Sequence, residues 1–273
     1  MTKTIALIFC LFLSCSLSAQ TYKQLAEQAL TCIEKDSLPK AQELLKAALK
    51  LEPTNPRNAL LLSNLGTVQR RMEKYEDAIE SYTLALNLSA TTVPILMNRA
   101  SLYLEIGNQD KAYIDYCDVL DLNKENTDAL LFRAYIYVKR QDYKAALIDY
   151  ERLLALSPES ISGRMGLATL YQKEKKYPQA LETFNKLLAE HPTDALIYIA
   201  RADLEREMSH LDLALTDADE AVRLSPTSAD AYLLRGEIYL LLKKKTMAKI
   251  DFEKAIELGV PQVELHEQLK QCK

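Results

Sequence analysis

Glycine is scarce in this chain, with only six among 273 residues. Glycine supplies the positive φ angles and the close backbone approach on which many tight turns and phosphate-binding loops depend. The sequence also has no Gly-x-Ser-x-Gly elbow and no Gly-x-Gly-x-x-Gly loop. These absences disfavour folds built on glycine-rich turns or nucleotide loops, and they suit short connections between helices.

Cysteine and histidine are equally few. Three cysteines lie beyond the first twenty residues, far apart and odd in number, so a disulfide framework is not expected: Cys32, Cys117 and Cys272. The histidines lack HExxH spacing and a cysteine partner, which disfavours a zinc site: His191, His210 and His266. We therefore expect a protein that is not an enzyme and has no catalytic residues, metal or cofactor.

An excess of positive charge is also missing. Residues 1–19 contain one cation, Lys3, and no acid, so the remainder has 33 Lys and Arg against 38 Asp and Glu, a net charge of −5. A general nucleic-acid binder would be basic overall. The composition therefore indicates that nucleic acid is not the partner.

Long apolar runs are absent except at the start, where Ile5 to Leu13 follows Lys3 and leads to the small residues before Ala19. A membrane-spanning helix needs about 20 apolar residues, so we expect no membrane span. The pattern predicts a secretory signal peptide at residues 1–19, cleaved near Ala19. The mature protein would then be periplasmic or secreted, in a bacterium.

A lipoprotein is the alternative. The segment Phe12-Leu13-Ser14-Cys15 resembles the lipobox of bacterial lipoproteins, whose cysteine becomes the lipidated first residue. An anchor at Cys15 would suit a role in envelope or pilus assembly. Only residues 16–20 would then separate the lipid from the first helix, a reach of at most about 18 Å.

What the chain does contain is a repeat. Alanines recur every 34 residues, preceded by an earlier copy at Ala41: Ala78, Ala112, Ala146, Ala180, Ala214 and Ala248. Within each interval the apolar residues recur at spacings of three and four in two runs. A period near 34 with two amphipathic helices per unit is typical of a helix-turn-helix solenoid.

Further positions in the same phase resemble the tetratricopeptide repeat (TPR) family. A small residue occupies the eighth position (Ala29, Gly66, Ala100, Ala134, Ala168, Ala202, Gly236), and an aromatic stands late in most second helices (Tyr82, Tyr116, Tyr150, Phe184, Phe252). The resemblance implies an all-α, right-handed superhelix of antiparallel helix pairs across residues 20–260. Its seven repeats would begin at Tyr22, Ala59, Val93, Thr127, Ile161, Ala195 and Ala229, and residues 261–273 would form a capping helix.

The residue before each predicted first helix is a good N-cap, able to accept hydrogen bonds from unpaired amides of the first turn. These residues are Thr21, Asn58, Thr92, Asn126, Ser160, Asp194 and Ser228.

Arginine at the seventh position and aspartate at the twenty-third occur together in four repeats, and neither occurs in the other three. Such joint variation indicates contact, and a planar guanidinium can bind a carboxylate through two hydrogen bonds. We therefore expect structural ion pairs between the paired helices of these repeats, in preference to catalytic carboxylates: Arg99 with Asp115, Arg133 with Asp149, Arg201 with Asp217 and Arg235 with Asp251.

The resemblance also places the fifth and ninth residues of each first helix on a concave groove that binds peptides or partner helices. From the third repeat on these positions form an apolar row edged by hydroxyls and acids, more than solubility requires: Met97, Ser101, Leu131, Tyr135, Met165, Thr169, Ile199, Asp203 and Leu233. The alternative is that neighbouring helices cover them. The expected function is a scaffold that binds a protein or peptide of unknown identity.

Overall fold

The computed structural model describes residues 21–89 and 92–273. The predicted signal peptide at residues 1–19, its cleavage near Ala19 and the alternative lipidation of Cys15 lie outside the described residues, so all three stay predictions.

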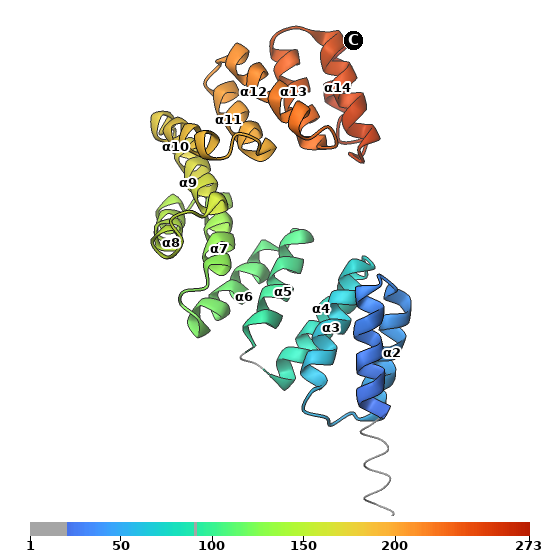
Figure 1. Ribbon diagram of the computed structural model, residues 1–273. Coiled ribbons are helices and arrows are strands. Elements are labelled where there is room, and N and C mark those ends of the chain that lie inside the picture. Colours follow the sequence, from blue (N-terminus) through green and yellow to red (C-terminus); the bar gives the residue numbers. More distant parts are fainter. Residues whose placement is uncertain (1–20, 90–91) are drawn as a thin grey trace, which may run out of the picture. The chain divides into compact units, whose positions relative to one another are not determined.

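Helices make up all the regular secondary structure of the described residues, as the sequence predicted (Figure 1). The first helical stretch covers residues 21–34. It is followed by α2 (Leu38–Leu51), α3 (Asn58–Arg71), α4 (Tyr75–Leu88), α5 (Val93–Glu105), α6 (Gln109–Leu122), α7 (Thr127–Lys139), α8 (Tyr143–Leu156), α9 (Ile161–Lys173), α10 (Tyr177–Glu190), α11 (Ala195–Glu207), α12 (Leu211–Leu224), α13 (Ala229–Leu241), α14 (Lys245–Glu257) and α15 (His266–Gln271).

The chain divides into two compact units, one ending at Ala129 and the other running from Leu130 to Lys273. In the first unit α3 packs on α4 and α5 on α6; in the second, α9 packs on α10, α11 on α12 and α13 on α14. The short turn within each pair makes its helices antiparallel. Five of the predicted repeat starts coincide with the first residues of α5, α7, α9, α11 and α13, and α3 begins one residue early, at Asn58.

Aromatic side chains fill the space between paired helices. Tyr82 and Phe252 are almost completely buried, opposite Gly66 and Gly236 on the partner helix. A Cβ atom added to Gly236 would stand 2.7 Å from Phe252 Cε1, and one added to Gly66 would stand 2.8 Å from the Tyr82 ring. The small eighth residue therefore lets the ring approach the backbone of the first helix closely.

The turn inside every repeat has the same unusual backbone. The fifteenth residue has φ between 57° and 78° in all seven repeats, although only the third has glycine there: Asp36, Glu73, Gly107, Gln141, Lys175, Ser209 and Lys243. The residue after it donates its N–H to a carbonyl five residues back, as Lys176 does to Tyr171 at 2.8 Å. This is the Schellman arrangement that pairs the last carbonyls of a helix.

The predicted N-caps behave unequally. Side chains of four of them accept a backbone N–H of the first turn: Asn126, Ser160, Asp194 and Ser228. Thr92 stands at the N-cap of α5, but its hydroxyl bonds with Ser89 instead. The prediction for Asn58 is wrong, because Asn58 is the first residue of α3 and Arg57 is the N-cap.

The longer first connection explains the difference at Asn58. The buried Asn58 amide donates to the carbonyls of Glu52 and Pro53 at 2.8 and 3.0 Å, and its oxygen accepts from the Tyr22 hydroxyl at 3.0 Å. The side chain thus pairs the carbonyls of the connection and cannot cap the helix.

The terminal helix is shorter than predicted. Residues 262–265 form turns, in which the N–H groups of Glu264 and Leu265 donate to the carbonyls of Pro261 and Gln262 three residues back, and α15 starts only at His266. The segment still covers the last core: Leu265 is buried with Tyr239 and Phe252, and Leu269 and Cys272 pack against them.

Candidate functional site

First helices of neighbouring repeats contact one another directly in the second unit, α9 with α11 and α11 with α13. Residues four apart lie on one side of a helix, so the fifth and ninth residues of each helix line the same surface. We call this surface the inner face. Its fifth and ninth positions are Leu131, Tyr135, Met165, Thr169, Ile199, Asp203, Leu233 and Glu237.

The fifth-position side chains of the inner face are half-buried. Each packs against the core of its own region: Leu131 against the cluster of Ala134 and Tyr150, and Met165 against that of Phe184. Ile199 and Leu233 pack in the same way against the next two clusters. Neighbouring helices therefore cover part of this row, and the uncovered part is an apolar strip.

The ninth-position side chains change character along the unit. Tyr135 is 42% exposed. The Thr169 hydroxyl donates a hydrogen bond to the Met165 carbonyl at 2.9 Å. Asp203 and Glu237 follow, so the end of the inner face nearest α15 is acidic.

Asp203 belongs to a polar network that sequence reasoning missed. The buried Gln172 amide donates to Asp203 at 3.0 Å and to Glu207 at 2.8 Å, and Glu207 also accepts from the Tyr177 hydroxyl at 3.0 Å. Arg206 donates to the other oxygen of Asp203. The twelfth position of the repeat, Gln172 and Arg206, carried the signal that could have revealed this network.

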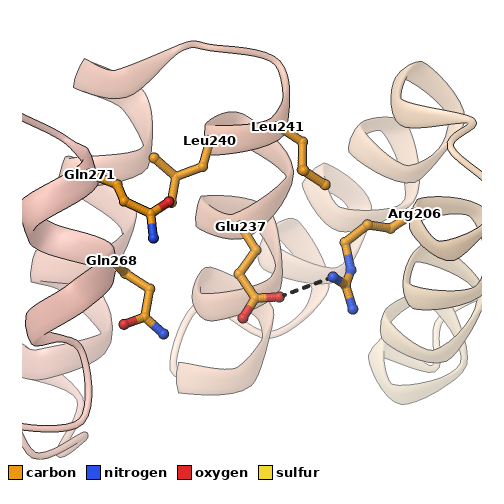
Figure 2. Close-up of a pocket in the computed structure, with 6 residues that line it drawn as sticks. All are labelled: Arg206, Glu237, Leu240, Leu241, Gln268 and Gln271. Carbon is orange, nitrogen blue, oxygen red and sulfur yellow. Dashed lines mark ion pairs between the residues drawn. The ribbon is translucent and has the colours of Figure 1, made fainter.

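A pocket of about 310 Å³ lies where α11, α13 and the terminal segment meet (Figure 2). Arg206 and Glu237 form one side, with 3.6 Å between Nη1 and Oε2. Leu240, Leu241, Gln268 and Gln271 complete the lining. The pocket offers apolar, amide and charged groups side by side, which is the mixture that a peptide segment presents.

The inner-face prediction also named two residues of the first unit, Met97 and Ser101 on α5. Both are half-buried there.

The structure brings all four predicted arginine–aspartate pairs together. In each pair Nε and Nη2 donate to the two carboxylate oxygens at 2.7 to 2.9 Å, and the aspartates are buried. These hydrogen bonds raise the pKa of Arg99, Arg201 and Arg235. Both partners are thereby occupied, as expected of structural ion pairs.

The described residues contain no cluster of three or more histidine, cysteine, aspartate or glutamate side chains suited to hold a metal ion. Among the same residues no helix has the length and apolar character to cross a bilayer. Cys32, Cys117 and Cys272 are half-buried, and none of them forms a disulfide within the described residues.

Comparisons with known proteins agree with the repeat pattern. Family models for the tetratricopeptide repeat match residues 61–92, 97–161, 137–204 and 229–258. The crystal structure of a tetratricopeptide repeat protein from Parabacteroides merdae ATCC 43184 is 38% identical, with a TM-score of 0.89, covering 93% of this chain and 99% of that one.

Two further relatives are more distant. Human DnaJ homolog subfamily C member 7 is 31% identical over 99 residues, which are 36% of this chain and 20% of that protein. The chain thus spans about a fifth of the length of the curated relatives that it matches. Pseudomonas aeruginosa pilF, 18% identical with a TM-score of 0.61, covers 81% of this chain and is itself 99% covered, and it shares the fold. The repeat phase, the paired helices and these matches show that the chain belongs to the tetratricopeptide repeat family.

Proposed function

We propose that this protein is a non-catalytic scaffold that holds a segment of a partner protein across the inner face of its second unit. A tetratricopeptide repeat fold is typical of protein–protein interaction. The observation that carries the proposal is the strip of Leu131, Met165, Ile199 and Leu233, half-buried at one position in four successive repeats. A periodic apolar strip matches the periodic side chains of a bound helix or extended segment.

The acidic end of the inner face favours a partner segment that also carries a cation. Arg206 is the one guanidinium among the carboxylates of Asp203, Glu207 and Glu237. The 3.6 Å separation between Arg206 and Glu237 leaves room for a second donor at the Glu237 carboxylate. We infer that the segment places apolar side chains on the strip and a lysine or arginine at Glu237.

Export is a separate part of the proposal, supported by the sequence of residues 1–19. Mass spectrometry of the mature protein tests it directly. A free N-terminus at Gln20 is the result that we expect, whereas an acylated Cys15 would establish the lipoprotein alternative. An uncleaved Met1 would contradict both.

Binding at the inner face is tested by affinity capture from the native cell envelope with two matched double variants. Tyr135→Ala with Glu237→Lys alters two exposed or half-exposed inner-face residues. Ile148→Ala with Glu151→Lys makes the same kinds of change on the exposed side of α8, where Ile148 is 64% exposed. Thermal melts of both variants establish that they remain folded.

We expect the inner-face variant to retain its partner at least about tenfold less well than wild type, and the α8 variant to retain it fully. Equal retention by both variants would refute the proposed surface.

A further inference from the structure

In the fourth to sixth repeats, the second helix contributes apolar side chains to the contact with the next repeat. Its first and fifth residues are aromatic or aliphatic in the fourth to sixth repeats: Tyr143 and Leu147, Tyr177 and Leu181, and Leu211 and Leu215. Leu147 packs in the cluster that contains Leu170 of the following repeat. Leu215 likewise packs against the cluster of Tyr239 and Phe252. These two positions therefore bury apolar surface between repeats.

The last repeat has lysines at the same two positions, Lys245 and Lys249 on α14. Both side chains are exposed, and Lys249 lines the same recess as Cys272 of the terminal segment. The six-residue helix α15 packs against α14.

A notch of about 730 Å³ remains beside α15, and we call it the end notch. Its lining includes Lys249 and Glu253 from α14 and His266, Leu269, Lys270 and Lys273 from the terminal segment. Glu253 is 3.6 Å from Lys249, so it neutralises one of the three lysines. Glu264 and Glu267 belong to the same segment but are not among the residues that line the notch.

Solubility of a terminal repeat requires a polar outer surface, and charges of either sign meet that need. The lining of the end notch has three lysines and one glutamate, and it includes the half-buried Leu269. This excess of lysine over glutamate beside an apolar side chain complements an acidic segment that also carries an aliphatic side chain.

We propose that the end notch is a second interaction surface, which binds an acidic amphipathic segment of a partner protein. Carboxylates of the segment pair with Lys249, Lys270 and Lys273, while an aliphatic side chain packs on Leu269. A recess of this volume seats a protruding segment, whereas a flat anionic membrane would reach only its rim. The surface is formed by α14 and the terminal segment, apart from the inner face.

Fluorescence anisotropy tests the proposal with a fluorescein-labelled synthetic peptide that forms a helix with glutamates on one side and leucines on the other. A peptide with lysine in place of each glutamate is the probe control. Lys249→Glu with Lys270→Glu reverses two charges in the end notch. Lys46→Glu with Lys144→Glu makes the same change in net charge at exposed positions of α2 and α8.

We expect the wild type to bind the glutamate peptide at least about tenfold more tightly than the lysine peptide, and to lose affinity as NaCl rises from about 50 to about 500 mM. The end-notch variant should lose that preference, while the Lys46 and Lys144 variant should bind within about twofold of wild type. Leu131→Ser in the inner face should also leave binding unchanged, which separates this test from that of the proposed function.

Equal binding by the wild type and the end-notch variant would overturn the proposal. So would binding to vesicles containing phosphatidylglycerol without binding to the glutamate peptide, because that result would assign the lysines to a membrane surface.

Discussion

Arg201 and Asp217 form a two-pronged contact between the helices of the sixth repeat, with Nε and Nη2 each 2.7 Å from a carboxylate oxygen. The remaining guanidinium nitrogen of Arg201, Nη1, donates to the side-chain oxygen of Asn185 in the preceding repeat at 2.7 Å. Arg99 and Arg235 repeat the pattern by donating from Nη1 to Thr83 and Asp219. Each of these three arginines therefore ties the second helix of its own repeat to that of the repeat before it.

Replacing only one residue of the Arg201–Asp217 pair should lower the free energy of unfolding more than replacing both. Arg201→Leu leaves the buried Asp217 carboxylate unpaired, and we expect a loss of about 3 kcal/mol in the free energy of unfolding. Arg201→Leu with Asp217→Leu should lose only about half as much, because no buried charge is stranded. The fifth repeat, with Leu167 and Thr183 at these positions, shows that the fold accepts an uncharged pair. Urea denaturation measures both; a double variant no more stable than the single one would be the contrary outcome.

The left-handed turn residues offer a gain in stability. Lys175 has φ 60°, a region that glycine enters without steric cost, so Lys175→Gly should raise the free energy of unfolding by about 0.5–1 kcal/mol. Tyr171→Gly, four residues earlier inside α9, should instead lower it by about 1 kcal/mol or more, because glycine is unfavourable within a helix and the tyrosine packing is also lost. Thermal melts of both variants test this prediction. A lower melting temperature for Lys175→Gly than for the wild type would contradict the claim that the positive φ at Lys175 costs stability.

The close approach of the Phe252 ring to Gly236 predicts that a smaller residue at position 252 will partly restore the stability lost on replacing Gly236. Gly236→Ala should destabilise the seventh repeat by about 1–3 kcal/mol, because the new methyl meets the Phe252 ring. Phe252→Leu removes the ring edge, so the two changes together should cost less than the sum of their separate costs. A double-mutant cycle in urea measures this coupling. Strict additivity would mean that the ring does not set the helix spacing.

Alkaline pH should weaken the fold through its buried tyrosines. Burial raises the pKa of Tyr116 to about 12 and also raises that of Tyr150, above the ordinary value of 10.0. A raised pKa means that the folded state holds the phenol proton more tightly, so this stabilisation is complete below pH 10 and is lost as the pH rises from 10 towards 12.

Tyr116→Phe with Tyr150→Phe should therefore move the alkaline unfolding midpoint, followed by circular dichroism, to higher pH. Tyr171→Phe is the control, because Tyr171 acts on neither of these phenols, and it should leave the midpoint in place. An unchanged midpoint in the double variant would show that other groups govern alkaline unfolding.

Most of the fold could be predicted from the sequence because small residues recur along the chain at a fixed interval of 34 residues. Each repeat contacts its neighbours, so the spacing of Ala112, Ala146 and Ala180 was enough to locate the helices. The joint occurrence of Arg201 and Asp217 predicted their contact for the same reason. The hydrogen bond from Arg201 to Asn185 was not predicted, because the position that Asn185 occupies holds different residues in different repeats.

Other features depend on geometry that composition does not reveal. Position fifteen holds six different residue types, so its left-handed backbone has no sequence signal beyond Gly107. Asn58 looks like an N-cap in sequence, and only the fold shows that it pairs the carbonyls at Glu52 and Pro53. The acidic end of the inner face was predicted from the ninth positions, whereas the network through Gln172 and Arg206 involves the twelfth positions, which the prediction did not include.

The proposal that the inner face binds a partner is tested most directly by site-specific photo-crosslinking in the cells that make the protein. The photoreactive analogue p-benzoyl-phenylalanine replaces Tyr135 on the inner face or, in a matched chain, the 64% exposed Ile148 on α8. We predict that mass spectrometry will find a partner protein crosslinked at Tyr135 and not at Ile148. A partner captured at Ile148 and absent from Tyr135 would contradict the account.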